Sequence, residues 1–178
     1  MKKTKLSLIS TICLVFPSIV VAALTQGSLG TTSTGTVDIT ITKTAGVQIT
    51  DLANFTFGSV TAAPTAINDD ICVFSNNSGG YSITATSTNA SGTTFRLNDG
   101  STGYINYSVK WNDVAGTTGS TSLGSGTNLT TQSGANAVDP TCGGGTNANL
   151  EVTIDSTTFS TAPTGAYTDV LTILISPV

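Results

Sequence analysis

The sequence predicts an all-β fold of the sandwich type. Short apolar blocks are separated by turn-forming Asn, Gly, Ser and Thr, and seven or eight such blocks follow one another along the chain, as in β-sandwiches. Several blocks alternate apolar and polar residues, which places one face of each strand in a core. No segment has a helical period of any length. Thr-rich strands joined by Gly and Asn turns are typical of all-β extracellular proteins.

Residues 1–23 are expected to be a signal peptide. Three lysines precede an apolar run over residues 6–21, and small residues follow at positions 21–23, which is the pattern of a cleavable export signal. A membrane anchor is the alternative, but Pro17 and the small residues favour cleavage. The sequence therefore predicts export through the periplasm to the cell surface or medium, without membrane insertion of the mature chain.

Removing this signal leaves a strongly acidic chain. The whole chain has six basic and ten acidic residues and a charge of −4, whereas the mature chain keeps three basic residues against all ten acidic ones, which gives −7. Nucleic acid and anionic membranes are therefore not expected as partners. About 155 residues remain, enough for one domain with a real core.

Strands are expected in order along the mature chain. They are residues 36–42, a stretch from Val47 and Ile49 towards Phe55 and Phe57, and then residues 71–74, 81–86, 94–97, 104–111, 149–154 and 167–176. Residues 24–35, rich in Gly, Ser and Thr, are expected to be mobile until captured. Residues 115–141 are long for a loop and are expected to contain one short strand, near 121–123 or 128–130. Trp111 falls on the same face of its strand as Val109, so it is predicted to anchor the core. Surface stacking on a ligand is the alternative.

The two ends of the mature chain predict subunits that complete one another. Apolar side chains occupy even and odd positions of the last strand, at Val170, Leu171, Ile173, Leu174 and Ile175. Both faces of this strand are therefore expected to be buried, and it needs a neighbour on each side, yet the chain ends there. Residues 36–42 alternate apolar and polar, as a strand supplied to some sheet would.

The cysteines predict one disulfide. Cys13 leaves with the signal, and Cys72 and Cys142 remain as an even pair, 70 residues apart, in an exported chain, where disulfides form. Closing this loop is worth roughly 4 kcal/mol in the chain-entropy model. A two-thiol metal site is the alternative, but it needs further ligands and the chain has no histidine.

The sequence carries no pattern that predicts an enzyme, a metal site or a cofactor. Without histidine, a nucleophile would need one of few cationic or acidic side chains as its base. Asp69 and Asp70 are the one adjacent carboxylate pair and are expected in a solvated turn; no motif supports a glycosidase pair. Residues 68–70 and 98–100 could lend oxygen atoms to calcium, but neither has the spacing of a calcium loop, and plain turns are the simpler interpretation.

Several blocks together resemble a known family. Residues 72–76, 81–86, 107–113 and 139–143, and a turn with Pro163, Gly165, Tyr167 and Asp169 before the last strand, are similar to chaperone–usher pilins of the archaic, spore-coat-U-like type. The resemblance implies an immunoglobulin-like sandwich that lacks its seventh strand. It also implies three partners: a periplasmic chaperone that lends a strand, an outer-membrane usher, and other copies or related pilin subunits, the next of which inserts its N-terminal extension.

Carried onto this chain, the resemblance divides it into residues 24–42, the extension, and residues 43–178, the pilin-like domain. The side chains expected to insert are Val37, Ile39 and Ile41, and the acceptor groove is expected beside Leu171, Ile173 and Ile175. An alternative boundary extends the donor segment to Val47 and Ile49.

The expected function is a structural subunit of a surface fimbria or pilus, assembled by donor-strand exchange and supporting adhesion or biofilm. One alternative is a self-complete secreted surface or matrix protein, in which residues 36–42 pair beside residues 168–176 of the same chain. Another is a small adhesive module that binds through residues 115–141.

Overall fold

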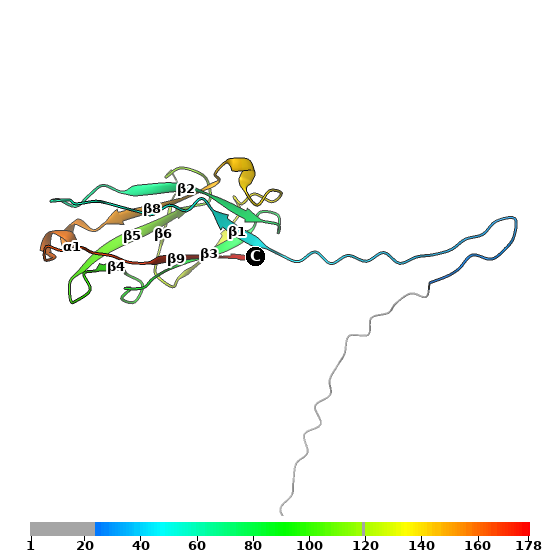
Figure 1. Ribbon diagram of the computed structural model, residues 1–178, viewed down its shortest axis with the longest axis horizontal. Helices are drawn as coiled ribbons and strands as arrows, with labels where there is room; N and C mark the ends of the chain where they lie inside the picture. Colours follow the sequence, from blue (N-terminus) through cyan, green and yellow to red (C-terminus); the bar gives the residue numbers. More distant parts are fainter. Residues whose placement is uncertain (1–23, 119) are drawn as a thin grey trace, which may run out of the picture. The chain divides into compact units, whose positions relative to one another are not determined.

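The computed structural model describes residues 24–118 and 120–178. Two antiparallel sheets form a β-sandwich within Thr44–Val178 (Figure 1), and the predicted all-β sandwich is thereby confirmed. The first sheet consists of β1 (Val47–Thr50), β2 (Ile67–Ser75), β4 (Phe95–Asn98), β5 (Tyr104–Asn112), β6 (Thr121–Leu123) and β8 (Ala148–Ile154). The second consists of β3 (Tyr81–Ser87), β7 (Asn128–Gln132) and β9 (Leu171–Pro177).

The strand order is that of an immunoglobulin-like sandwich. In a constant-type immunoglobulin domain, strands A, B, E and D face strands C, F and G. Here β1, β2, β8 and β5 occupy the positions of A, B, E and D, with β4 and β6 on β5, while β3 and β9 occupy those of C and F. On the side of β9 away from β3, where G would lie, no described residue forms a strand.

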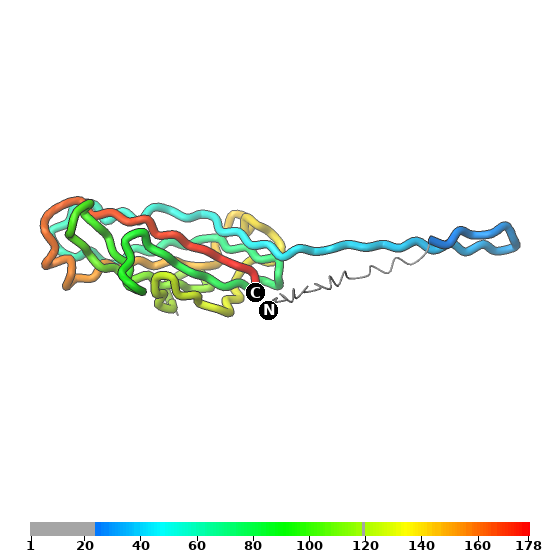
Figure 2. Tube along the Cα trace, turned by 90° about the horizontal axis from the view of Figure 1, so that it is seen from below, coloured from blue at the N-terminus to red at the C-terminus, as the bar shows by residue number. Residues whose placement is uncertain are grey.

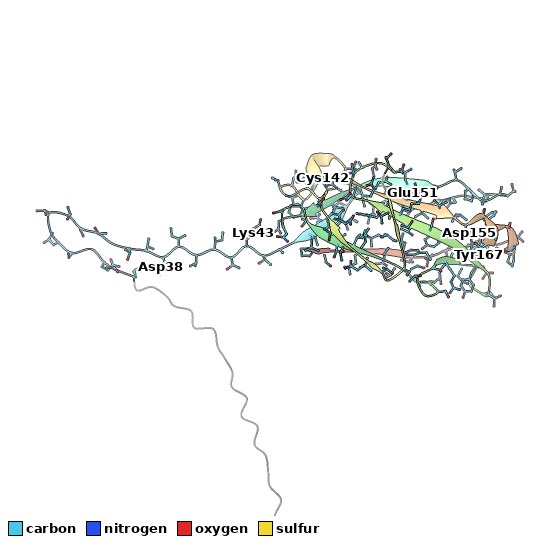
Figure 3. The ribbon with its side chains drawn as sticks, turned by 180° about the vertical axis from the view of Figure 1, so that it is seen from behind. Asp38, Lys43, Cys142, Glu151, Asp155 and Tyr167 are labelled. Atoms are coloured by element: carbon cyan, nitrogen blue, oxygen red, sulfur yellow. A yellow bond between two sulfur atoms is a disulfide. The ribbon has the colours of Figure 1, made fainter. Side chains whose placement is uncertain are left out.

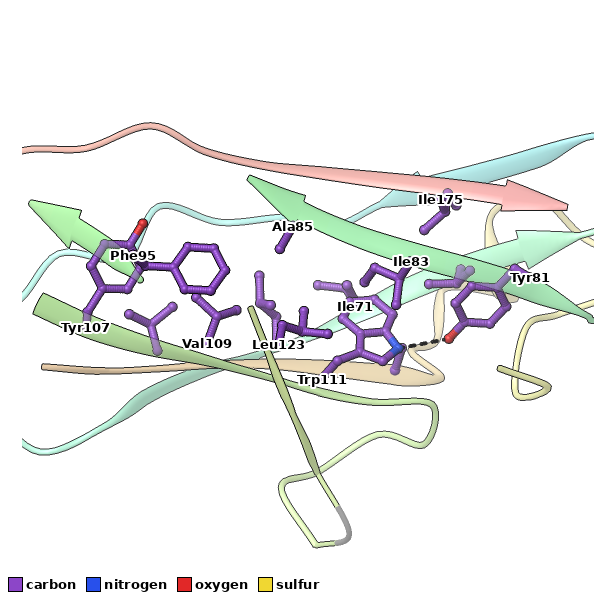
Figure 4. Packing of buried hydrophobic residues seen from close by; sticks show 14 of the residues in the cluster. Ile71, Tyr81, Ile83, Ala85, Phe95, Tyr107, Val109, Trp111, Leu123 and Ile175 are labelled. Atoms are coloured by element: carbon purple, nitrogen blue, oxygen red, sulfur yellow. Dashed lines mark hydrogen bonds between the residues drawn. The ribbon is translucent and has the colours of Figure 1, made fainter. Parts of the chain in front are cut away.

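The core lies between the two sheets and is anchored by aromatic residues. Trp111 is 1% exposed, and its ring meets that of Tyr81 edge-on at 6.3 Å. Its Nε1 donates a hydrogen bond of 3.2 Å to the Tyr81 hydroxyl (Figure 4). Phe95 and Tyr107 stack nearby with ring centroids 5.5 Å apart. The prediction of Trp111 as a core anchor is confirmed.

Several expected elements differ from the observed ones. The last strand begins at Leu171, not near residue 167. Only one of its faces is buried, whereas burial of both was expected, and Leu174 on the other face is 60% exposed. Asp69 and Asp70 lie within β2 rather than in a turn, where the Asp69 carboxylate accepts the Ala53 amide at 2.8 Å. Residues 67–71 pair with β8, and this pairing extends β2 on the N-terminal side of the apolar block 71–74 that predicted it.

The structure also contains two short helical segments that the sequence did not predict. A short helix, α1 (Ser156–Thr161), follows β8, and a 3-10 turn, η1 (Cys142–Gly144), contains the second cysteine. Their length is too short for a helical period to be recognised. Residues 115–141 contain both candidate short strands, as β6 and β7. No helix among the described residues is long and apolar enough to cross a membrane.

The segment before the sandwich forms a separate unit that ends at Lys43. Within its described part, Thr25 and Thr36 form one antiparallel bridge, with a 3.0 Å hydrogen bond from the Thr36 amide to the Thr25 carbonyl. Residues 37–42 are extended but belong to no strand, so the strand expected at 36–42 is not formed in the isolated chain. The signal peptide expected at residues 1–23 lies outside the described residues.

Candidate binding groove

A large groove runs along β9 between the edges of the two sheets. Its volume is about 1250 Å³, larger than the pockets of about 300–1,000 Å³ that hold small molecules. Aliphatic side chains of the first sheet line it, including Ile105 on β5 and Val152 and Ile154 on β8. An apolar groove of this size is suited to an extended peptide segment rather than a metabolite.

One wall of the groove is β9. Leu171 and Ile173 line it and are half-buried. Ile175, two residues further along, is 8% exposed and belongs to the closed core instead. The structure therefore places Leu171 and Ile173 on the groove, and Ile175 beyond its end.

The backbone of β9 has one paired and one unpaired edge. All seven of its residues pair with β3, from Leu171 opposite Ser87 to Pro177 opposite Tyr81. No strand of the described chain pairs with its other edge. A free edge of this kind exposes amide and carbonyl groups on which a further strand can form.

Residues 51–66 form the opposite wall and are not in a strand. Phe55 and Phe57 are half-buried and pack against the core, whereas Leu52 and Val60 are 48% and 41% exposed. Figure 2 shows this cyan stretch and the red trace of β9 along the same side of the domain. Apolar side chains thus face the groove from both walls and its floor.

The loop that leads into β9 closes one end of the groove. The Tyr167 hydroxyl donates to the Pro163 carbonyl at 2.9 Å, which is the arrangement of a tyrosine corner at the start of strand F in immunoglobulin-like domains. Thr168 pairs with Asn98 of β4 through both backbone groups. Tyr167 and Asp155 lie at this end of the domain, and Cys142 lies at the other (Figure 3).

A tyrosine–carboxylate pair sits beside this loop. The Tyr107 hydroxyl on β5 donates to Asp169 Oδ2 at 2.5 Å. Burial, followed by the hydrogen bond to Asp169, raises the pKa of Tyr107 far above its usual value. The hydroxyl therefore remains protonated and keeps its role as donor. The sequence shows Asp169 in a turn motif but does not reveal its pairing with Tyr107, because strand alternation gives no cross-sheet partners.

The expected disulfide is present, away from the groove. Cys72 of β2 and Cys142 of η1 are joined with an S–S distance of 2.05 Å and a Cα–Cα distance of 6.0 Å. The bond ties the far end of residues 115–141 to the first sheet. Among the described residues, no group of three or more acidic or cysteine side chains is placed to hold a metal ion.

The residues expected to insert into a partner all lie in the leading unit. Val37, Ile39 and Ile41 are 70%, 89% and 94% exposed. Three exposed aliphatic side chains at alternate positions of an extended segment are unusual for a soluble protein, since their burial is favourable.

Solved structures are similar to this chain in fold. No family model matches the sequence, and no curated protein does. A solved structure described as a chaperone–tip adhesin complex vital for synergistic activation of CFA/I fimbriae biogenesis contains a similar chain, with a TM-score of 0.50 and 14% identity. The similarity covers 75% of this chain and 42% of that one. It establishes a shared β-sandwich fold with a protein of a fimbrial system.

Proposed function

We propose that this chain is a structural subunit of a surface fibre, and that the groove of one copy binds residues 36–42 of another. The observation that carries the proposal is the unpaired edge of β9 beside an apolar groove. An added strand would occupy the position of the missing seventh strand. The same chain carries a segment of matching chemistry in Val37, Ile39 and Ile41.

The physical chemistry of the two parts is complementary. Burying three aliphatic side chains stabilises the complex by roughly 1.5–3 kcal/mol each. Side chains at alternate positions of a strand point to one face, so Val37, Ile39 and Ile41 would enter the groove together, while Asp38 and Thr40 would face outward. Pairing with β9 would satisfy the backbone of both partners.

The proposal includes the partners and location expected of such a subunit. A chain from a solved chaperone–tip adhesin complex has a similar fold, and the blocks of sequence resembling spore-coat-U-like pilins agree with a fimbrial role. We infer a periplasmic chaperone that covers the groove before assembly, an outer-membrane usher, and display on the cell surface, where the fibre supports adhesion or biofilm. The role is structural rather than catalytic.

The test is the electrophoretic behaviour of the purified exported protein. Strand-exchanged fibres should run as a ladder in SDS without heating and collapse to one band on boiling. Deleting residues 24–42 should abolish the ladder, and Ile39→Asp or Ile41→Asp should do nearly the same, because a carboxylate in an apolar groove is costly.

The matched control is Thr40→Asp, which adds the same charge to the outward side of the same segment. It should leave the ladder intact. A single monomer band from the unaltered protein would instead indicate a chain that completes its own sheet. Normal ladders from Ile39→Asp and Ile41→Asp would show that other residues insert.

A further inference from the structure

A hydrogen-bonded cluster holds the start of β9 to the opposite sheet at one end of the groove. Tyr107 is 6% exposed and donates from β5 to Asp169 Oδ2 at 2.5 Å. Asp169 is two residues before β9. This bond therefore spans from the first sheet to the strand that forms the wall of the groove.

Asp169 has further partners that fix its direction. Its Oδ1 accepts hydrogen bonds from the Asn89 amide at 3.1 Å and from Asn89 Nδ2 at 3.0 Å. The Asn89 carbonyl in turn accepts from Arg96 Nε at 2.9 Å. The carboxylate is thus held between two elements, the β3–β4 connection and β5, and cannot turn to solvent without losing three hydrogen bonds.

The cluster faces the apolar groove, whose walls are exposed to water when no strand fills it. Tyr107 and Asp169 both line the groove, and Asp169 is the only charged residue among the described residues that do so. Exposed aliphatic walls favour coverage by an incoming strand, because coverage removes apolar surface from water. A carboxylate resists burial against such walls unless its hydrogen bonds are kept, and the Tyr107 hydroxyl on β5 supplies one of the three that Asp169 accepts.

We propose that Tyr107 is a positioning residue that keeps the Asp169 carboxylate hydrogen-bonded at the groove wall, so that an incoming strand can cover it. The inference rests on the proposed strand exchange and adds a condition for it. Without the Tyr107 bond, an incoming strand would cover a carboxylate that has lost one of its hydrogen bonds, which is costly, while the backbone bonds of Thr168 with Asn98 and of β9 with β3 keep β9 itself in place. The groove then accepts the incoming segment slowly or weakly, although the domain itself stays folded.

The experiment measures strand uptake by the full chain. The parent carries Ile39→Asp and Ile41→Asp, so that its own copies do not fill the groove, and the probe is a fluorescent synthetic peptide of residues 34–43 with the natural sequence. Adding Tyr107→Phe should slow or weaken uptake at least about tenfold, the factor expected for one hydrogen bond to a charged group. Asn89→Ala, which leaves the groove lining intact, should give a smaller loss.

The matched control is Tyr81→Phe, which also removes a hydrogen-bonded hydroxyl from a buried tyrosine but lies outside the groove. It should change uptake by less than about twofold, with thermal stability measured for every variant. Equal effects of Tyr107→Phe and Tyr81→Phe at equal stability would overturn the positioning role alone. If Tyr107→Phe does not fold, unchanged uptake by Asn89→Ala overturns it. A folded parent that takes up no peptide would overturn the strand exchange as well.

Discussion

Single residues set both the rigidity of the domain and the shape of its groove. Trp111 shows how: its ring fills the core beside Tyr81, and its one polar atom is paired with the Tyr81 hydroxyl. A buried indole N–H without a partner would be costly. Trp111 and Tyr81 therefore stabilise the closed core to which Ile175 belongs. The groove lies further along β9, beside Leu171 and Ile173.

Replacing Trp111 with alanine should destabilise the domain by about 3–5 kcal/mol, because it removes a large buried ring and leaves a cavity. This is a large part of the total stability of a typical domain, about 5–15 kcal/mol. Urea denaturation followed by circular dichroism measures the loss. Tyr104→Ala, at a 40% exposed position, is the control and should cost much less. Similar losses for both would contradict the assignment of Trp111 as the core anchor.

Asp155 stabilises the start of α1 in a pH-dependent way. Its Oδ1 accepts the Thr158 amide at 2.7 Å, and this bond is the main reason that the pKa of Asp155 lies below its ordinary 3.8. A lowered folded-state pKa means that the stabilisation is fully present above pH 3.8 and is lost as the pH falls through the folded value. Asp155→Ala should therefore lower the melting temperature at pH 7 and have less effect near pH 2.

Serine at this position is the useful control, because it caps helices well but does not titrate. Asp155→Ser should retain much of the stability of the natural chain at neutral pH and lack the acid-dependent part. A melting difference between the aspartate and alanine proteins that stays constant down to pH 2 would contradict the role of the charged cap.

At the scale of elements, alternation predicts most strands but not their edges. Residues 81–86, 104–111 and 149–154 were expected from alternating side chains, and the structure has β3, β5 and β8 there. The start of β9 was misplaced because Asp169 turns inward to Tyr107, a contact that no local pattern encodes. Phe55 and Phe57 suggested a strand, but they lie in a wall of the groove where no described residue forms a partner strand.

The groove itself could be inferred from the sequence only in outline. A last strand with apolar side chains suggested a missing neighbour, and Leu171 and Ile173 do line the groove. The burial of Ile175 and the exposure of Leu174 depend on where the two sheets meet. The place where the sheets meet is set by packing between strands far apart in the chain. A single sequence does not encode it.

The disulfide joins two elements that no hydrogen-bonded strand pairing connects. Removing it with Cys72→Ala and Cys142→Ala should lower the free energy of unfolding by about 3–4 kcal/mol, as expected for a closed loop of 70 residues. Urea denaturation of the natural protein in reductant should give the same midpoint as the double variant. The double variant should not respond to reductant. A natural protein whose midpoint is also insensitive to reductant would contradict the prediction.

At the scale of the whole molecule, one unit contains the groove and the other contains the segment that we propose fills it in another copy. Two variants can separate these parts. The donor variant, Ile39→Asp with Ile41→Asp, should keep its groove and lose its segment. The groove variant, Leu171→Glu, should keep its segment and lose its groove, because a carboxylate on that wall is not compensated.

Each variant alone should be monomeric in unheated SDS electrophoresis and in analytical ultracentrifugation. An equimolar mixture of the two should form dimers and no larger species, since only one intact groove and one intact segment are present in each pair. Thr172→Glu, on the outward side of β9 where the side chain is exposed, is the control and should polymerise normally. If each chain completed its own sheet, the natural protein itself would be a monomer in both measurements, because its own residues 36–42 would already fill the groove.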